Sequence, residues 1–234
     1  MKKISIIIPT YNEAENIKKL IPLLHSVIKN YDHEIIIVDD DSPDGTAKVA
    51  EDLAKKYPVR VFVRKNERGL ASAILFGFKN AQGDILGVMD ADLQHPPELL
   101  QKMIEKIKEG YDIVIASRYT KEGRIEKWPS YRLLISKGAT LLAKPLTRVK
   151  DPMSGYFILK RSVIDDLKFD SIGYKLLLEI LVKGKYKKVI EIPYTFKNRK
   201  YGRSKLNFFE ILKYIHLLIR LYTYKLKKLL LNLS

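Results

Sequence analysis

The chain has 234 residues, 46% of them hydrophobic, which is enough for one sizeable core and an appendage. It has no cysteine, which excludes disulfides, thiolate nucleophiles and Cys-ligated metal sites and fits a reducing compartment. With 43 Lys and Arg against 27 Asp and Glu, the formal net charge of +16 indicates a polyanionic partner, or the Lys-rich surface common in thermophiles.

Strand-like and helix-like segments alternate through the first half of the chain. Short apolar runs are expected as strands at residues 4–9, 34–38, 59–63, 85–89 and 112–116. Helical patterns are expected at residues 14–30, 45–56, 70–81 and 96–109. This alternation predicts an α/β fold, with a mostly parallel sheet and helices on both faces. No G-x-G-x-x-G follows the first strand and no G-x-x-x-x-G-K-[ST] occurs, which weakens dinucleotide and P-loop interpretations.

The second half of the chain is less regular. A polar, basic loop is expected at residues 121–130, and then a helix at 131–149 in which basic and apolar residues are mixed. A strand, a helix and a strand are expected at residues 155–160, 174–183 and 189–192. Residues 198–205 predict a flexible basic loop, and a long helix closes the chain. We expect a catalytic domain over residues 1–207 and an amphipathic helix over 208–234.

Two carboxylates follow the fourth predicted strand. Side chains two apart on an extended segment point the same way, so Asp90 and Asp92 should converge at the carboxyl end of the sheet, where open α/β sheets bind ligands. Convergent carboxylates repel unless a cation or a shared proton relieves them. Gln94 adds a neutral oxygen, and the set suits Mg²⁺ or Mn²⁺. The alternative makes Asp92 a helix cap before Pro96 and Asp90 a solvated strand end.

The first two predicted strands also end in acidic and amide residues. The first runs into P-x-Y-N-E and the second into V-D-D-x-S-x-D-G-T. Either alone could be a helix start, with Asn12 or Asp44 as the N-cap. Together with D-A-D, they resemble the family 2 glycosyltransferases of GT-A fold, in which these segments hold the nucleotide of a sugar donor. The resemblance covers about residues 4–117.

The downstream half narrows this resemblance. The segment Ser117-Arg118-Tyr119, then Arg132 and Ser136, then D-P-M-S-G-Y at 151–156 and G-R-S-K at 202–205 resemble the dolichyl-phosphate (polyprenol-phosphate) mannosyltransferases. The last two segments fit polyprenol-phosphate sugar synthases in general and are less decisive for mannose. This part of the resemblance runs to about residue 207.

The resemblance implies a role for each matching residue. The implied donor-nucleotide site consists of Pro9, Tyr11, Glu13, Val38, Asp39, Asp90, Ala91, Asp92, Arg203 and Lys205. The implied metal ligands are Asp90, Asp92 and Gln94. The implied acceptor-phosphate site consists of Arg118, Arg132 and Ser136. The residues expected to act in catalysis are Asp92, Arg118, Arg132 and Arg203.

The chemistry of sugar transfer to a lipid phosphate fits these residue types. A bound divalent ion would act as a Lewis acid on the departing diphosphate, and arginine's planar fork suits phosphate oxygens. A phosphate monoester is largely ionised at neutral pH, with a second pKa of about 6, so no general base is required. None of the histidines at positions 25, 33, 95 and 216 has a triad-like setting. For His95 a supporting or surface role is favoured over that of a metal ligand.

Basic and apolar residues alternate at the C-terminus. From Arg203 to Ser234 there are seven basic residues and one acidic residue, a local charge of +6. An apolar arc lies opposite the basic one; its residues are Ile211, Leu212, Ile215, Leu218, Ile219, Tyr222, Leu226, Leu229 and Leu230. This pattern, like that of residues 131–149, predicts a helix lying in a membrane surface or binding a partner. The alternative is a helix packed on the protein's own core.

We therefore expect an inverting, metal-dependent transfer of mannose from GDP-mannose to dolichyl or polyprenyl phosphate. No run of about 18 uncharged apolar residues occurs, so a membrane-spanning helix is not expected, and the N-terminus shows no leader-like cleavage pattern. We expect a peripheral position on the cytoplasmic face of a membrane. A small membrane subunit is left open as a partner. The alternatives are a UDP-glucose or other sugar-nucleotide donor, a non-catalytic membrane-associated binding protein, and a nucleic-acid-binding module. The last is disfavoured because no zinc-finger or RNP1-like motif occurs.

Overall fold

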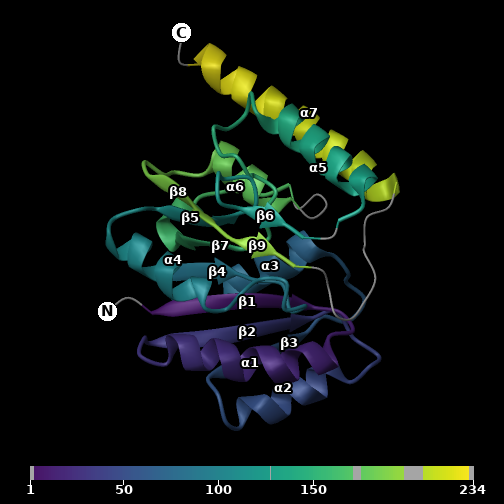
Figure 1. The fold of residues 1–234 in the computed structure, drawn as a ribbon, viewed down its shortest axis with the longest axis vertical. Helices are drawn as coiled ribbons and strands as arrows, with labels where there is room; N and C mark the ends of the chain where they lie inside the picture. Colours follow the sequence, from purple (N-terminus) through teal and green to yellow (C-terminus); the bar gives the residue numbers. More distant parts are fainter. Residues whose placement is uncertain (1–2, 127, 171–174, 198–207, 232–234) are drawn as a thin grey trace.

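The computed structural model describes residues 3–126, 128–170, 175–197 and 208–231 (Figure 1). A central sheet of seven strands has the order β3-β2-β1-β4-β7-β5-β8. Its strands are β1 (Ile4–Thr10), β2 (His33–Asp39), β3 (Val59–Val63), β4 (Ile85–Val88), β5 (Ile113–Ser117), β7 (Phe157–Lys160) and β8 (Val189–Pro193). All neighbours are parallel except β7, which is antiparallel to β4 and β5. The predicted mostly parallel α/β sheet is confirmed.

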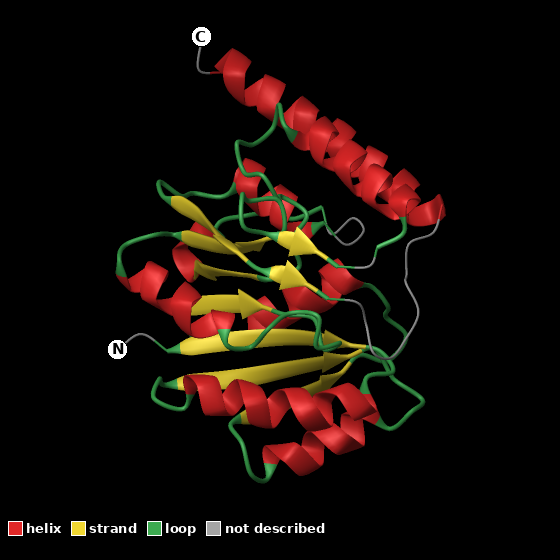
Figure 2. Cartoon of the chain, in the orientation of Figure 1, coloured by secondary structure: helices red, strands yellow, loops and turns green. Residues whose placement is uncertain are grey.

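Helices cover both faces of this sheet (Figure 2). The described α-helices are α1 (Ala14–Ile28), α2 (Thr46–Ala54), α3 (Leu70–Asn80), α4 (Leu99–Lys108), α5 (Ser130–Ala143), α6 (Leu176–Lys183) and α7 (Phe208–Leu231). Alternate residues of β1 enter two cores: Ile6 and Ile8 pack with α1 and α4, whereas Ile7 packs with α3 and α6. Successive side chains of a strand point to opposite faces of the sheet. A strand that is buried on both faces therefore has a continuous run of apolar residues in its sequence.

Two predicted segments differ from the structure. The helix expected at 131–149 ends at Ala143, because Pro145 has no N–H to donate and its ring disfavours a further helical turn. The loop expected at 121–130 contains a two-residue strand, β6 (Arg124–Ile125), which pairs with β9 (Thr195–Phe196). A short 3₁₀ turn (Arg161–Val163) follows β7.

The last helix packs beside α5 along one end of the molecule (Figures 1 and 2). The Tyr214 hydroxyl donates to the Ala139 carbonyl at 2.6 Å, and the Tyr222 hydroxyl donates to the Leu142 carbonyl at 2.6 Å. A small core of its own lies under this helix pair, comprising Ala143, Leu146, Met153, Leu178, Tyr214, Leu217, Leu218 and Leu221. Leu218, expected on the open apolar arc, is therefore part of this packed face instead.

Much apolar surface nevertheless stays open on these two helices. Among the described residues, every exposed large hydrophobic side chain except Leu23 and Val63 lies on α5 or α7. On α5 they are Tyr131, Leu134, Ile135, Leu141 and Leu142; on α7 they are Phe209, Leu212, Ile215, Ile219, Tyr222, Tyr224, Leu226, Leu229, Leu230 and Leu231. We call this set the α5–α7 apolar face. No helix in the described ranges is long and apolar enough to cross a bilayer.

Candidate active site

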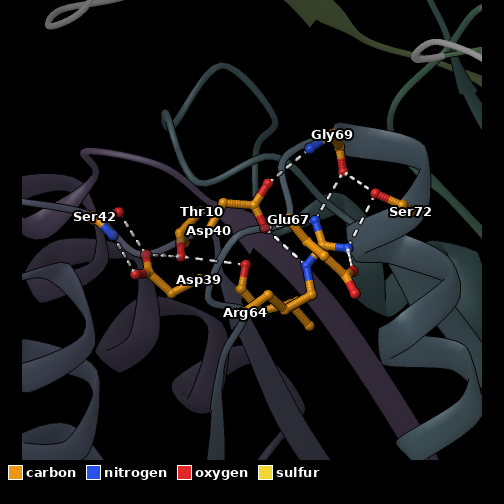
Figure 3. A network of polar contacts seen from close by, with 9 residues as sticks. Thr10, Asp39, Asp40, Ser42, Arg64, Glu67, Gly69 and Ser72 are labelled. Atoms are coloured by element: carbon orange, nitrogen blue, oxygen red, sulfur yellow. Dashed lines mark hydrogen bonds and ion pairs between the residues drawn. The ribbon is translucent and has the colours of Figure 1, made fainter.

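Asp39 lies at the carboxyl end of β2 and is completely buried. Hydrogen bonds to its carboxylate link the ends of β1 and β2 (Figure 3). Its carboxylate accepts the Thr10 hydroxyl at 2.8 Å, the Ser42 N–H at 2.8 Å and the Ser42 hydroxyl at 2.6 Å. Since these donors are neutral, Asp39 adds a net negative charge to this edge of the sheet. Val38, which the resemblance also assigns to the donor nucleotide, is fully buried.

The neighbouring Asp40 is tied into an ion pair that braces the loop before α3 (Figure 3). Arg64, itself buried, donates to the Asp40 carboxylate through Nε at 2.8 Å and through Nη2 at 2.5 Å. The other Asp40 oxygen accepts the Gly69 N–H at 2.9 Å. The carboxylates of Asp39 and Asp40 therefore differ: Asp40 pairs with an arginine and holds the loop, whereas Asp39 accepts from the uncharged groups of Thr10 and Ser42.

The P-x-Y-N-E segment lies beside this edge. Backbone N–H groups of Asn12 and Glu13 donate to Ser42 and Thr46, both at 2.9 Å, so the β1–α1 and β2–α2 loops form one unit. The Arg68 guanidinium lies 4.7 Å from the centre of the Tyr11 ring. Sequence analysis did not select Arg68, because a lone arginine in a loop carries no pattern. Neither Asn12 nor Asp44 is the N-cap; those positions belong to Glu13 in α1 and Gly45 in α2.

The D-A-D segment follows β4 and is mostly enclosed. Asp92 and Gln94 are buried, whereas 32% of the Asp90 side chain is exposed. The Gln94 N–H donates to Asp92 at 3.1 Å, and the Gln94 side-chain amide donates to the Lys197 carbonyl at 2.6 Å. The three residues follow β4 at the carboxyl end of the sheet; that they form one metal site stays a prediction.

The buried His95 supports Asp90 from behind. Its Nδ1 lies 3.2 Å from the Asp90 N–H and accepts from it, which leaves the proton on Nε2, 3.9 Å from the Asp90 carboxylate. The ring is stacked on Tyr156 with 5.1 Å between ring centres and meets Tyr194 and Phe196 edge-on. These contacts agree with the expected supporting role of His95.

The residues around Asp90 fit a hard divalent cation. Two carboxylates and a neutral amide are the oxygen donors that Mg²⁺ and Mn²⁺ prefer, with substrate phosphates and water completing the shell. A Cβ placed on Gly155 would lie 3.2 Å from an Asp90 carboxylate oxygen, so glycine keeps the space over this carboxylate open. Among the described residues, no group of three or more acidic, His or Cys residues is arranged to hold a metal ion.

Arg118 follows β5 and faces a buried carboxylate. Its backbone N–H, Nε and Nη2 donate to Asp151 at 2.9, 2.8 and 2.7 Å. Burial alone would lower the pKa of Arg118, but the charge and hydrogen bonds of Asp151 raise it, so the guanidinium stays charged. The backbone N–H groups of Asp151 and Lys150 donate in turn to the Glu191 carboxylate, each at 2.9 Å.

Trp128 brings the two predicted acceptor arginines together. The Arg132 guanidinium lies 4.1 Å from the Trp128 ring centre, and that of Arg118 lies 5.7 Å from it. Ser136 accepts the Tyr119 hydroxyl at 2.7 Å. The structure therefore places Arg118, Arg132 and Ser136 around one aromatic cluster, whereas Arg203 and Lys205 lie outside the described residues.

Sequence analysis missed one further cation, Lys175, at the start of α6. Burial and the charges of Arg118 and Arg132 lower the pKa of Lys175, the charges of Asp151 and Asp90 raise it, and together they bring it to about 7. Lys175 thus lies within the electrostatic reach of both the D-A-D segment and the arginines. No local pattern marks it, because a lysine before an apolar helix reads as an ordinary helix start.

His25 and His33 contact each other at the opposite end of β2.

Comparisons with known proteins identify the family. The Glycosyl transferase family 2 domain matches residues 5–168. The dolichol-phosphate mannosyltransferase of Saccharomyces cerevisiae is 40% identical over 94% of this chain and 87% of its own length. The dolichol-phosphate mannosyltransferase of Pyrococcus furiosus is 51% identical over 93% of this chain. The chain belongs to the dolichol-phosphate mannosyltransferases of glycosyltransferase family 2.

Membership of the dolichol-phosphate mannosyltransferases confirms the predicted family and identifies the chain as a glycosyltransferase. The match spans 64% of the length of the Pyrococcus relative. Solved structures share the fold at 18% identity: mannosyl-3-phosphoglycerate synthase from Rubrobacter xylanophilus has a TM-score of 0.67 over 97% of this chain and 74% of its own. Glucosyl-3-phosphoglycerate synthase from Mycobacterium tuberculosis, solved with Mn²⁺ and UDP-glucose, has a TM-score of 0.67 over 93% and 80%. These likenesses confirm the GT-A fold.

Proposed function

We propose that this glycosyltransferase transfers mannose from GDP-mannose to dolichyl or polyprenyl phosphate, with inversion at the anomeric carbon. One observation carries the proposal: in a chain that is 40–51% identical to dolichol-phosphate mannosyltransferases, Asp90 and Asp92 lie at the same sheet edge as the Arg118–Trp128–Arg132 cluster. A cation-binding side for the donor diphosphate thus adjoins an arginine-lined side for an anionic acceptor.

The donor side is assigned by the resemblance and supported by the geometry. Asp39 is assigned to the guanosine side by the resemblance; in this structure its carboxylate is buried and accepts from Thr10 and Ser42. Pro9 and Glu13 belong to the same joined loops, and Ala91 lies between the two carboxylates. Asp90, Asp92 and Gln94 would hold Mg²⁺ or Mn²⁺, which when bound neutralises charge on the diphosphate leaving group. Arg203 and Lys205 are assigned to the donor by resemblance alone.

On the acceptor side, Arg132 offers its planar fork to the lipid phosphate, with Ser136 one helical turn along α5. Arg118 is held by Asp151, so its role is to fix a positive charge at one orientation beside Trp128. The phosphate oxygen attacks C1 of mannose as the bond from C1 to the GDP oxygen breaks. Because the attacking oxygen is already ionised, no proton has to be removed.

The α5–α7 apolar face suits a protein that works on a lipid. Its leucines and isoleucines are exposed to a degree that a monomer in water rarely tolerates over such an area. We propose that this face lies on the cytoplasmic side of a membrane as an in-plane surface, with Arg132 on α5 close to the lipid phosphate. A small membrane subunit is a further proposed partner that could cover part of the same face.

The donor sugar is tested with a panel of radiolabelled sugar nucleotides and polyprenyl phosphate, scored for lipid-extractable product. GDP-mannose should give product that depends on a divalent ion and is lost in Asp92→Asn. Product from UDP-glucose in preference to GDP-mannose would replace this proposal with a glucosyltransferase. Donor hydrolysis and transfer both absent with every nucleotide would indicate a non-catalytic binding protein.

A further inference from the structure

A cavity of about 600 Å³ lies between the end of α5, the start of β8 and α7. Its lining includes Lys144, Arg148 and Lys225 as well as Tyr186 and Glu191. We call it the α5-end cavity. Of its lining residues only Glu191 takes part in the candidate active site, where it accepts the Asp151 N–H. The helical rise over 12 residues separates Lys144 from Arg132 by roughly 18 Å.

The charge of this cavity is strongly positive. The carboxylate of Glu191 is engaged by the backbone N–H groups of Lys150 and Asp151. Lys225 donates to the Pro145 carbonyl at 2.7 Å, which fixes its ammonium at the cavity wall. Within the described part of the chain, Lys144 and Arg148 have no acidic partner. Three cations and one carboxylate that is already hydrogen-bonded therefore line the cavity.

A second cavity nearby provides a contrast. It also lies against α7 and is lined by Lys183 and Arg220, but Asp170 is part of the same lining. Asp170 forms ion pairs with Lys183 at 2.8 Å and with Arg220 at 2.6 Å. Two of its four cations, Lys183 and Arg220, are thus paired within the protein, whereas Lys144 and Arg148 of the α5-end cavity have no acidic partner among the described residues.

The surroundings of the α5-end cavity indicate what kind of anion it fits. Leu141 and Leu142, at the end of α5, are 61% and 54% exposed. On α7, Leu226, Leu229 and Leu230 follow Lys225 directly and are each 58% exposed. A free anion needs only the cations, whereas an anionic amphiphile uses the cations for its head and the leucines for its chains. Basic pockets beside apolar helices bind acidic lipid headgroups for this reason.

We propose that the α5-end cavity binds the phosphate headgroup of an anionic phospholipid, with its acyl chains against the α5–α7 apolar face. The site is separate from that of the lipid acceptor. This proposal rests on the proposed location of the α5–α7 apolar face at a membrane. A bound headgroup would increase the affinity of the enzyme for the bilayer and would fix its orientation on the bilayer. Arg132 would then be presented to the membrane in one orientation.

The test compares two variants that lose the same charge from comparable positions. Lys144→Gln with Arg148→Gln removes two cavity cations, and Lys137→Gln with Lys228→Gln removes two exposed cations of α5 and α7 outside the cavity. On equimolar phosphatidylglycerol and phosphatidylcholine vesicles, the control variant should bind at most about 30-fold more weakly than wild type, from roughly 1 kcal/mol of diffuse attraction per cation. The cavity variant should lose several-fold more than the control, because its cations also contact the headgroup. Equal losses in the two variants would overturn the proposal, since they would indicate diffuse attraction alone.

A second measurement removes the bilayer. Short-chain phosphatidylglycerol below its critical micelle concentration should bind wild type one-to-one in calorimetry and should not bind the cavity variant. Inorganic phosphate binding as tightly as this lipid would overturn the lipid assignment. If wild type does not bind the equimolar vesicles, the proposed membrane location fails, while binding of the short-chain lipid still tests the cavity.

Discussion

Arg118 and Asp151 lie 33 positions apart in the chain and form three hydrogen bonds, at 2.9, 2.8 and 2.7 Å, in a buried ion pair. The carboxylate is fully buried and the guanidinium side chain is 9% exposed. Pairs of this kind hold a cation in one orientation, but each partner becomes costly when the other is removed.

Asp151→Asn should therefore lower the free energy of unfolding by about 3–5 kcal/mol, because the Arg118 charge stays buried without its partner. The double variant Asp151→Asn with Arg118→Gln should regain part of this loss and yet remain poor in transfer to polyprenyl phosphate. Urea denaturation of the wild type, both single variants and the double variant measures the coupling. Additive effects in this cycle would show that the pair contributes no interaction of its own.

Gly155→Ala should weaken Mn²⁺ binding in the presence of GDP by about tenfold, since the new Cβ would crowd the Asp90 carboxylate at 3.2 Å. The fold should be retained, because Gly155 has no positive φ that only glycine tolerates. Gly138→Ala on α5 is the matched control, because nothing lies within 4 Å of its added Cβ. Electron paramagnetic resonance of free Mn²⁺ measures both. Unchanged affinity in Gly155→Ala would place the cation away from Asp90.

The affinity of the ligand-free protein for GDP should fall as the pH rises through 7, because the ammonium of Lys175, with a pKa of about 7, loses its proton there. An anion bound nearby retains that proton, so binding near pH 7 takes up protons. Calorimetry in buffers of different ionisation enthalpy measures the uptake. Lys175→Met should remove it, which separates Lys175 from the titration of the diphosphate itself.

The same group contributes to stability with a defined sign. Its folded pKa of about 7 lies below the ordinary value of 10.5, so between these values the unfolded chain binds more protons than the folded chain. The contribution of Lys175 to the free energy of unfolding therefore rises from pH 7 towards pH 10.5, and Lys175→Met should flatten that part of the curve. A steeper curve in the variant would contradict the lowered pKa.

Two kinds of change in α7 should separate packing from membrane contact. Leu229→Ser with Leu230→Ser alters two exposed residues and should weaken vesicle binding without changing thermal stability. Leu217→Ser with Leu221→Ser alters two residues that are 1% and 0% exposed and should destabilise the protein by several kcal/mol. Co-sedimentation with vesicles and thermal unfolding measure the two effects. Deleting the chain after Asn207 is less informative, because it would also uncover Leu178 and Met153.

The sequence predicted the site best where polar residues directly follow an apolar strand. Strands that end at Thr10, Asp39 and Val88 could be predicted from apolar runs followed by polar residues, so the edge that gathers Asp90 and Asp92 was foreseeable. The pairing of β6 with β9 was not, because two-residue strands have no period. Asp151, Trp128 and Lys175 reach the site through contacts distant in sequence, and no local pattern records such contacts. The burial of Leu218 depends on how α7 lies against α5 and α6, which a helical period alone does not determine.

Position 94 is bound by two requirements at once. The Gln94 side-chain nitrogen donates to the carbonyl of Lys197, the last described residue before the segment that carries Arg203 and Lys205. The oxygen of the same amide is the proposed cation ligand. A glutamate would give the cation a charged oxygen ligand, but it has no N–H to donate to the Lys197 carbonyl. A lysine could donate to that carbonyl, but it has no oxygen to bind the cation. Only an amide carries a donor and an acceptor on one planar group, so this residue can join the cation-binding loop to the end of β9 while serving both.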